Sequence, residues 1–213
     1  MKISEVFYSV QGEIDVGMPA TFIRFSGCNL IDQGKACKFC DSLYAQTNGR
    51  EMTEDEVVRE AMKYHCQNVV FTGGEPLYHD DDLTGLVERL ASKDFVLYVE
   101  TNGTLYTDLI DNDLVDFINC SPKKQSINLE ALKRINRKRA RFKFVYESGR
   151  DKWWENVIKK VGISSPQVYI MPEGKTREEQ LAKMPEVIDY CKQRGYNFTP
   201  RLHVLVWNTK RGV

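Results

Sequence analysis

The sequence predicts an α/β protein: an open, partial β/α barrel of about six parallel strands, in a single domain over residues 1–213 with short additions at both ends. Short runs rich in Val, Ile, Phe and Tyr alternate with longer helical patterns, which indicates right-handed βαβ units. The 213 residues fall short of the about 250 of a closed eightfold barrel. Composition is even along the chain, so we expect no domain boundary.

Each expected strand is a short apolar run that Gly or Pro stops. These runs lie at 21–27, 68–74, 95–103, 114–122, 141–147 and 167–174, with one more at 201–207. Helical patterns between them cover 53–65, 80–92, 128–137, 151–161 and 176–194. The first of these opens with Thr53, followed three residues later by Glu56, which predicts a capped helix start.

Charge and composition exclude several classes of protein. Thirty basic residues balance thirty acidic ones, which argues against bulk electrostatic binding of nucleic acid or an anionic membrane. No stretch approaches the roughly 18 apolar residues of a membrane span, and the N-terminus lacks the apolar run of a secretory signal. We therefore expect a cytoplasmic protein that binds neither nucleic acid nor membrane, with cysteines that are reduced.

Polar clusters follow the expected strands at their carboxyl ends, where parallel α/β proteins bind ligands. The clusters are SGC, TGGEP, ETNG, SPK and MPEG. Turn formation explains their glycines. It does not explain why Glu75, Glu100, Asn102 and Lys123 meet at the same edge.

Three cysteines are clustered as C-x8-C-x2-C, at Cys28, Cys37 and Cys40. Three thiolates suit a zinc ion whose fourth ligand is His65 or His79. They equally suit three irons of a [4Fe–4S] cluster whose fourth iron is open. The spacing alone favours neither.

The residues around the cysteines resemble the radical S-adenosylmethionine (SAM) superfamily. GCNL (27–30), KFCD (38–41) and TGGEP (72–76) carry this resemblance, although the first cysteine gap is eight residues rather than the usual three. We interpret residues 29–36 as an insertion in the cluster loop. FYSVQGE (7–13), ETNGT (100–104), SPK (121–123) and LHVLVWNTKRGV (202–213) narrow the resemblance to the 7-carboxy-7-deazaguanine synthase family.

The resemblance implies a radical SAM type of barrel with one [4Fe–4S] cluster per chain, held by the three clustered cysteines, and SAM bound at the open iron. Reductive cleavage of SAM would yield a 5′-deoxyadenosyl radical. Gly74 and Glu75 would contact the methionyl part, and two further segments would line the adenosyl part. The expected SAM-binding residues are Phe39, Cys40, Asp41, Gly74, Glu75, Ser121, Pro122, Lys123, Ile170, Met171, Pro172 and Glu173.

The implied reaction is a carbon–nitrogen lyase step of queuosine and 7-deazapurine biosynthesis. It contracts the ring of 6-carboxy-5,6,7,8-tetrahydropterin, with loss of ammonia, to 7-carboxy-7-deazaguanine. Arg24 offers a planar donor for the substrate carboxylate, and an arginine within an apolar strand needs such a partner. The expected substrate-binding residues are Val10, Gln11, Gly12, Glu13, Arg24, Thr72, His203 and Val213, the last through its terminal carboxylate.

The resemblance also implies Mg²⁺ near the substrate, with the Ser42 hydroxyl as its ligand where many members have Thr. It implies an electron donor such as a flavodoxin or ferredoxin, and a homodimer. Two alternatives stay open: an activase that forms a glycyl radical in a partner protein, and a non-catalytic zinc module in which the three cysteines are structural.

Overall fold

The computed structural model describes residues 1–38, 40, 42–111, 114–147, 149 and 151–210. Its described residues form one nine-stranded sheet in the order β3-β1-β2-β4-β5-β6-β7-β8-β9. From β2 to β9 every neighbouring pair is parallel, whereas β1 is antiparallel to β2 and to β3. The strands are β1 (Lys2–Val10), β2 (Pro19–Phe25), β3 (Arg50–Glu51), β4 (Asn68–Gly73), β5 (Val96–Thr101), β6 (Phe117–Cys120), β7 (Ala140–Tyr146), β8 (Val168–Pro172) and β9 (Asn197–Phe198).

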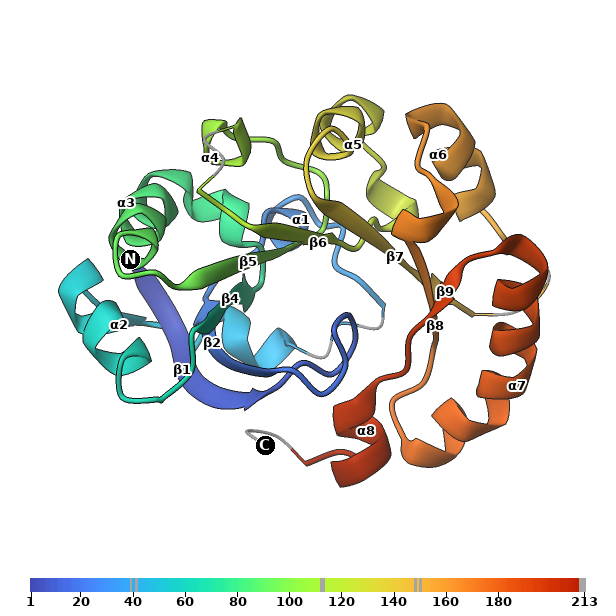
Figure 1. Cartoon of the computed structure of the whole chain (residues 1–213), viewed down its shortest axis with the longest axis horizontal. Helices are drawn as coiled ribbons and strands as arrows, with labels where there is room; N and C mark the ends of the chain where they lie inside the picture. The colour runs from blue at the N-terminus through green and yellow to red at the C-terminus, as the bar shows by residue number, and fades with distance from the viewer. Residues whose placement is uncertain (39, 41, 112–113, 148, 150, 211–213) are drawn as a thin grey trace.

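The sheet curves into an arc whose two edges, β3 and β9, do not pair, and the longer helices follow its outer side (Figure 1). This confirms the predicted open barrel. The α-helices are α1 (Asn29–Asp32), α2 (Glu54–Ala61), α3 (Asp80–Ala91), α4 (Asp108–Asp111), α5 (Leu129–Ile135), α6 (Trp154–Val161), α7 (Arg177–Arg194) and α8 (Leu202–Trp207). Short 3-10 turns are η1 (Leu43–Gln46), η2 (Pro76–His79), η3 (Lys124–Ser126) and η4 (Ser165–Gln167).

Two hydrophobic clusters lie on the two faces of the sheet. The larger fills the space between the sheet and the outer helices, and it includes Phe71, Phe142 and the fully buried Trp154. The smaller lies on the inner face, where Phe22 and Tyr98 pack with Ala20 and Val70. Since alternate residues of a strand point to opposite faces, β2, β4 and β5 contribute buried residues to both clusters.

The helix starts predicted at residues 53, 80, 128 and 176 agree with the structure, whereas the helix predicted from 151 begins at Trp154. Thr53 caps α2 and Thr176 caps α7, each in a reciprocal pair with the glutamate three residues later. Helix α2 ends at Ala61, earlier than the predicted 65. The two reciprocal caps satisfy amide groups that would otherwise lack partners at the helix starts.

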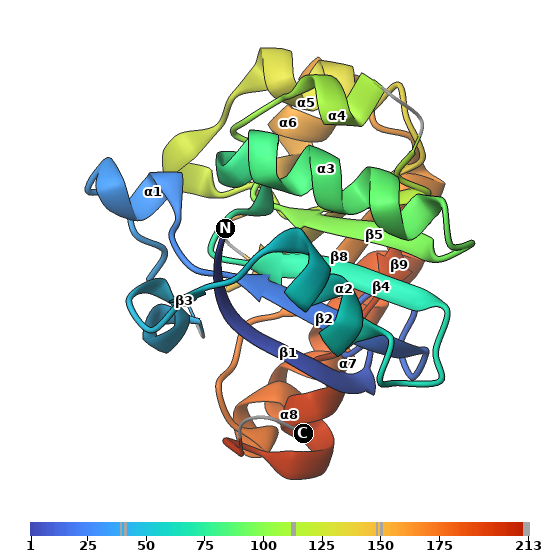
Figure 2. The same cartoon turned by 90° about the vertical axis from the view of Figure 1, so that its left-hand side faces the viewer.

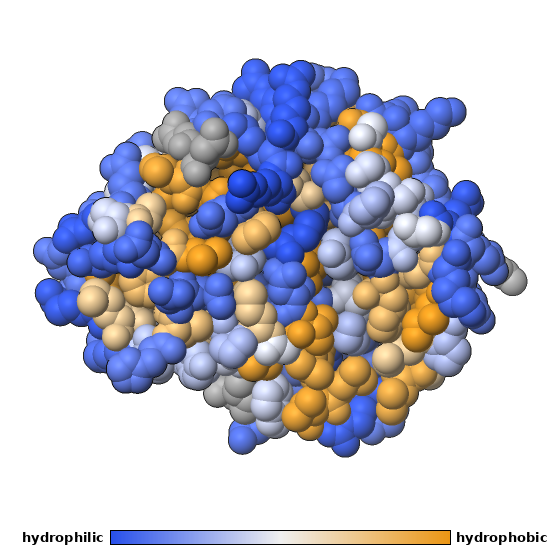
Figure 3. Space-filling model, in the orientation of Figure 1, coloured by the Kyte–Doolittle hydropathy of each residue, from blue (hydrophilic) through white to orange (hydrophobic). Residues whose placement is uncertain are grey.

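The prediction of a strand at 201–207 is wrong, because this segment forms α8 (Leu202–Trp207). The sheet ends at β9, whose two residues pair with β8. Pro200 follows and has no N–H to continue a ladder. A short apolar run is ambiguous between helix and strand, and its pattern here did not resolve the ambiguity. Hydrophobic residues reach the surface over the lower part of the view, where α8 is drawn (Figure 3), and Val206 of α8 is exposed.

The sequence predicts a short N-terminal addition without specifying its structure. In the structure this segment is β1, a strand of nine residues. It forms an antiparallel hairpin with β2 and so extends the sheet beyond the parallel strands. Within the described part of the chain, no helix combines the length and the apolar character needed to cross a membrane. Figure 2 shows α1 and the neighbouring turn η1 projecting from one end of the sheet, the end at which β2 stops.

Candidate functional site

The glycine loop, which begins at Gly73 as β4 ends, packs directly against the cysteine loop, which follows β2 and begins at residue 26. The amide of Gly74 donates to the carbonyl of Phe25 at 3.2 Å, and the amide of Glu75 donates to that of Gly27 at 3.1 Å. A side chain at Gly74 would overlap the Gly27 carbonyl, and Gly73 has a φ of +133°. Only glycine allows the two backbones to approach this closely.

The cysteine loop begins as soon as β2 ends. Cys28 is buried and precedes the single turn α1, and burial raises the pKa of its thiol. Cys37 and Cys40 are half-buried, and the amide of Cys40 donates to the Cys37 carbonyl at 3.2 Å. Phe39 and Asp41 lie outside the described residues. In the described ranges no three His, Cys, Asp or Glu side chains are grouped closely enough to hold a single metal ion.

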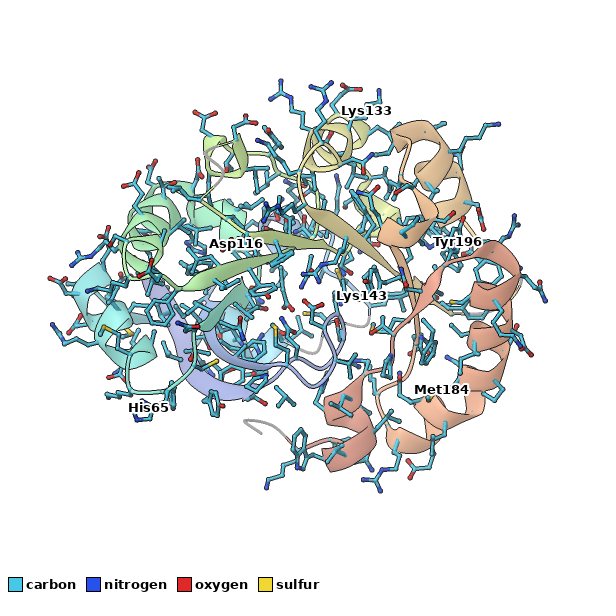
Figure 4. All side chains as sticks on the ribbon, in the orientation of Figure 1. His65, Asp116, Lys133, Lys143, Met184 and Tyr196 are labelled. Atoms are coloured by element: carbon cyan, nitrogen blue, oxygen red, sulfur yellow. The ribbon has the colours of Figure 1, made fainter. Side chains whose placement is uncertain are left out.

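The two histidines considered as zinc ligands lie in different places. His79 stacks on Phe25 with ring centroids 5.3 Å apart, and its Nε2 lies beside Gly27. Burial lowers its pKa. His65 is exposed and lies at the periphery of the molecule beyond α2 (Figure 4). Of the two, only His79 is close to the cysteine loop.

Glu75 is fully buried at the centre of this end of the sheet. Its carboxylate accepts hydrogen bonds from the amides of Leu77 at 3.2 Å and Asn102 at 2.6 Å. It thereby joins the turn η2 to the end of β5. Burial raises its pKa to about 7, although these amides favour the ionised form.

An amide network that the sequence did not reveal ties the cysteine loop to β5. Asn102 Nδ2 donates to Asn29 Oδ1 at 3.0 Å, and Asn29 Nδ2 donates to Thr104 Oγ1 at 2.9 Å. The backbone amide of Thr104 completes the network by donating to Asn102 Oδ1 at 2.9 Å. Asn29 and Thr104 lie within the GCN and ETNGT motifs, but nothing in their spacing predicts that they meet.

The ends of β6 and β8 contribute the other expected SAM-binding residues. Lys123 Nζ donates to Ser121 Oγ at 2.9 Å, and Pro122 between them is buried. On β8 the side chain of Ile170 packs into the outer hydrophobic cluster, so only its backbone can face a ligand on the inner side. Met171 and Pro172 are buried, and the Glu173 carboxylate pairs with Lys183.

Arg24 lies on the inner face of β2 in a polar group. Its Nε donates to Glu5 Oε1 at 2.6 Å and its Nη1 donates to Ser42 Oγ at 3.3 Å. Tyr44 also donates to Glu5, at 2.7 Å. The residues predicted for the substrate carboxylate and for Mg²⁺ are therefore adjacent.

A second polar pair lies on the inner face beside this group. Thr72 Oγ1 donates to Glu100 Oε2 at 2.7 Å, and Thr72 is level with Arg24 in the parallel register. The inner hydrophobic cluster lies further toward the amino ends of the strands, where Phe7 stacks on Phe22. The inner face thus carries two zones. We call the polar side chains of Glu5, Arg24, Thr72 and Glu100 the polar layer. We call the aromatic pairs Phe7–Phe22 and Tyr98–Phe117, nearer the amino ends of the strands, the aromatic floor.

The QGE segment (11–13) after β1 reaches across the interior of the arc to β7 and the start of α8. The Gly12 carbonyl accepts from the amide of Leu202 at 2.7 Å, and a side chain at Gly12 would overlap the imidazole of His203. Glu13 pairs with Lys143 on β7. Figure 4 shows Lys143 in the interior of the arc. Val10 pairs with Pro19 in the β1–β2 hairpin, Gln11 is buried, and Val213 lies outside the described residues.

The residues present fit the two groups that the sequence resemblance implies. The donor set is three thiols on one loop, which is the ligand chemistry of an iron–sulfur cluster with one open iron. Gly73 and Gly74 pack directly against the backbone of Phe25 and Gly27, so the glycine loop lies next to the thiols, where a zwitterionic ligand of the open iron would bind.

Comparison with known proteins gives concordant results. A family model for the radical SAM superfamily matches residues 22–184. A 7-carboxy-7-deazaguanine synthase of Halobacterium salinarum is 34% identical over 98% of this chain and 91% of its own length. One from Pyrobaculum aerophilum is 31% identical over 100% and 97%. The crystal structure of QueE from Escherichia coli superposes with a TM-score of 0.72, covering 95% of this chain and 94% of that chain at 22% identity.

Proposed function

The chain belongs to the 7-carboxy-7-deazaguanine synthase family of the radical SAM superfamily, and from this premise we propose that it catalyses the reaction for which its relatives are named. The substrate is 6-carboxy-5,6,7,8-tetrahydropterin and the products are 7-carboxy-7-deazaguanine and ammonia. This conversion belongs to 7-deazapurine biosynthesis. It balances as a ring contraction without net oxidation.

Each loop at this end of the sheet has a distinct task in the proposal. Cys28, Cys37 and Cys40 hold the cluster, and the backbone at Gly74 lies against the methionyl part of SAM. The segments 121–123 and 170–173 line its adenosyl part. When bound, the cluster and SAM together supply the radical that starts the reaction. Burial of Cys28 and Glu75 beneath these loops supports a site from which water is excluded.

The inner polar layer binds the substrate in this proposal. Arg24 pairs with the substrate carboxylate as a rigid, planar donor, and Glu5 holds the guanidinium in place. Gln11, Gly12 and Glu13, with Thr72 and His203, surround the pterin ring. The contact between Gly12 and the His203 imidazole supports their membership of one site.

One observation carries the proposal: a thiol loop and a polar layer lie at the same end of one curved sheet, and β2 contributes to both. Arg24 lies on this strand, and Cys28 follows its end. A radical formed beside the cysteines therefore has a short path to a substrate held by Arg24.

Anaerobic reconstitution followed by mass analysis of the product tests the function. We expect about four iron atoms and about four sulfides per chain. With a strong reductant, SAM and the carboxytetrahydropterin, we expect 7-carboxy-7-deazaguanine and an equal amount of ammonia. A colourless protein with one zinc would instead support the structural zinc module. A loaded cluster that cleaves SAM but leaves the pterin intact would favour the activase.

Magnesium is a further part of the proposal. The Ser42 hydroxyl lies beside Arg24, where a substrate carboxylate would complete an oxygen ligand set together with water. Serine has a smaller and more mobile side chain than threonine. We expect Mg²⁺ to stimulate turnover at this site.

Three finer properties complete the proposal. The electron donor is a flavodoxin or ferredoxin, the protein is a homodimer, and it acts in the cytoplasm. Exposed apolar residues on α7 and α8, including Leu181, Ile188 and Val206, offer surface for subunit contact. Light scattering on the purified holoenzyme measures the subunit number directly.

A further inference from the structure

The side chain of Asn119 on β6 is buried and has no hydrogen-bond partner within the part of the chain that the structure describes. The residue is 6% exposed, and neither Oδ1 nor Nδ2 has a partner among the described residues. Burying a carboxamide without partners is unfavourable, so native proteins satisfy nearly all such groups. A buried carboxamide with both atoms unpaired indicates that something else binds it.

Asn119 points to the inner face of the sheet. Its neighbours Ile118 and Cys120 belong to the outer hydrophobic cluster, and side chains alternate along a strand. Phe117, two residues earlier on the same face, stacks on Tyr98 at 4.9 Å in the aromatic floor. Asn119 therefore lies one step above this floor, at the level of the polar layer.

The parallel register places Asn119 between two charged residues. It is level with Glu100 on β5 and with Arg141 on β7. Both are engaged with other groups: Glu100 accepts from Thr72, and Arg141 Nη1 donates to both oxygens of Asp15 at 2.6 Å. Arg141 Nε and Nη2 are themselves buried without a partner among the described residues, so the carboxamide of Asn119 faces the inner side of the barrel beside further unsatisfied donors.

We propose that Asn119 is a substrate-binding residue whose carboxamide pairs with an edge of the fused pterin ring. A carboxamide presents a donor and an acceptor side by side. The reduced pterin offers the complementary arrangement wherever its carbonyl or ring nitrogen lies next to an N–H. The inference rests on the proposed function, because it assigns this residue to that substrate.

This assignment predicts opposite changes in stability and binding for Asn119→Leu, a substitution of similar size. The free protein no longer buries an unpaired carboxamide, so its thermal midpoint stays the same or rises. Substrate binding loses two hydrogen bonds, so its Kd rises by at least about tenfold. A residue with a merely structural role would show a lower midpoint instead.

Thr21 on β2 supplies a matched control. Its hydroxyl is also buried and unpaired among the described residues, and the residue is fully buried. It alternates with Ala20 and Phe22 of the inner cluster, so it points to the outer face. Thr21→Val removes a buried, unpaired hydroxyl at a position away from the site. We expect its thermal midpoint to rise with an unchanged Kd.

The experiment is anaerobic calorimetric titration of 6-carboxytetrahydropterin into the cluster-loaded full chain without reductant, with thermal unfolding in parallel. A weakened Kd in Asn119→Leu with an undiminished midpoint supports the assignment. A Kd within about twofold of wild type, or a weakened Kd with a lower midpoint, overturns it. If the wild type converts the pterin while Asn119→Leu binds it normally, only the assignment fails. If the wild type neither binds nor converts it, the proposed function fails.

Discussion

Arg24 and Glu5 lie opposite each other in the β1–β2 hairpin, and the guanidinium Nε donates to the carboxylate at 2.6 Å. Both side chains are largely buried, with 15% and 29% of their surface exposed. The pair compensates the charge of an arginine that would otherwise be costly on an inner strand. The antiparallel hairpin therefore orients the group that we propose for the substrate carboxylate before any substrate arrives.

Replacing Arg24 tests this role. We expect Arg24→Ala to weaken substrate binding by about 2–5 kcal/mol, because a buried charge pair with the substrate is lost. Steady-state kinetics measure this as a raised KM, with iron content unchanged. Arg89→Ala is the matched control, since this arginine pairs with Glu54 on the outer helices. An unchanged KM for Arg24→Ala would remove the residue from the site.

Substituting Gly74 tests the contact between the glycine and cysteine loops. In Gly74→Ala the added methyl overlaps the Gly27 carbonyl, so the cysteine loop must move. We expect most of the reconstituted iron and all measurable SAM binding to be lost. Gly34→Ala in the cysteine loop adds a methyl with no atom within 4 Å, at a φ of +69°. It costs about 1 kcal/mol and keeps the cluster. Equal iron content in the two variants would contradict this prediction.

The buried Glu75 predicts a pH dependence of stability. Its pKa is about 7 in the folded protein, against an ordinary value of 4.5. Between these values the unfolded chain releases the proton while the folded chain keeps it. Stability therefore falls as pH rises through this window, by about 3 kcal/mol in total, and then levels off. Below this pH window Glu75 is protonated in both the folded and the unfolded state, so it no longer destabilises the fold.

Urea unfolding of the metal-free protein between pH 4.5 and 8 measures this decline. Glu75→Gln cannot ionise, so we expect its free energy of unfolding to change less steeply across the window. Glu88→Gln, on the exposed side of α3, serves as the control and is expected to keep the wild-type slope. The same slope in wild type and Glu75→Gln would show that another group is responsible.

The hydroxyl at position 42 is expected to determine the response to magnesium. Ser42→Thr keeps the oxygen ligand and restricts its rotation, so it should retain or strengthen the stimulation of turnover by Mg²⁺. Ser42→Ala removes the oxygen and should abolish most of that stimulation. Titration of Mg²⁺ against turnover, with chelator-treated enzyme as baseline, compares the three proteins. Full stimulation in Ser42→Ala would exclude the hydroxyl as a ligand.

Much of this fold follows from local patterns in the chain. Apolar runs of strand length alternate with capped helical segments, and these patterns depend on neighbouring residues alone. The six longer parallel strands and the helix starts at Thr53 and Thr176 were therefore predictable. So was the gathering of TGGEP and the cysteines at one end, because parallel strands finish at the same edge of a sheet.

Contacts between residues far apart in the sequence could be identified only from the folded structure. Glu13 and Lys143 pair across 130 positions, and Asn29 meets Asn102 across 73. No periodicity encodes such pairs, because they depend on how strands and loops pack together. The segment 201–207 shows the same limit, since an apolar run suits a helix or a strand until its neighbours are known. The unpaired carboxamide of Asn119 is likewise visible only once burial on the inner face is known, because an asparagine in a sequence carries no mark of its partners.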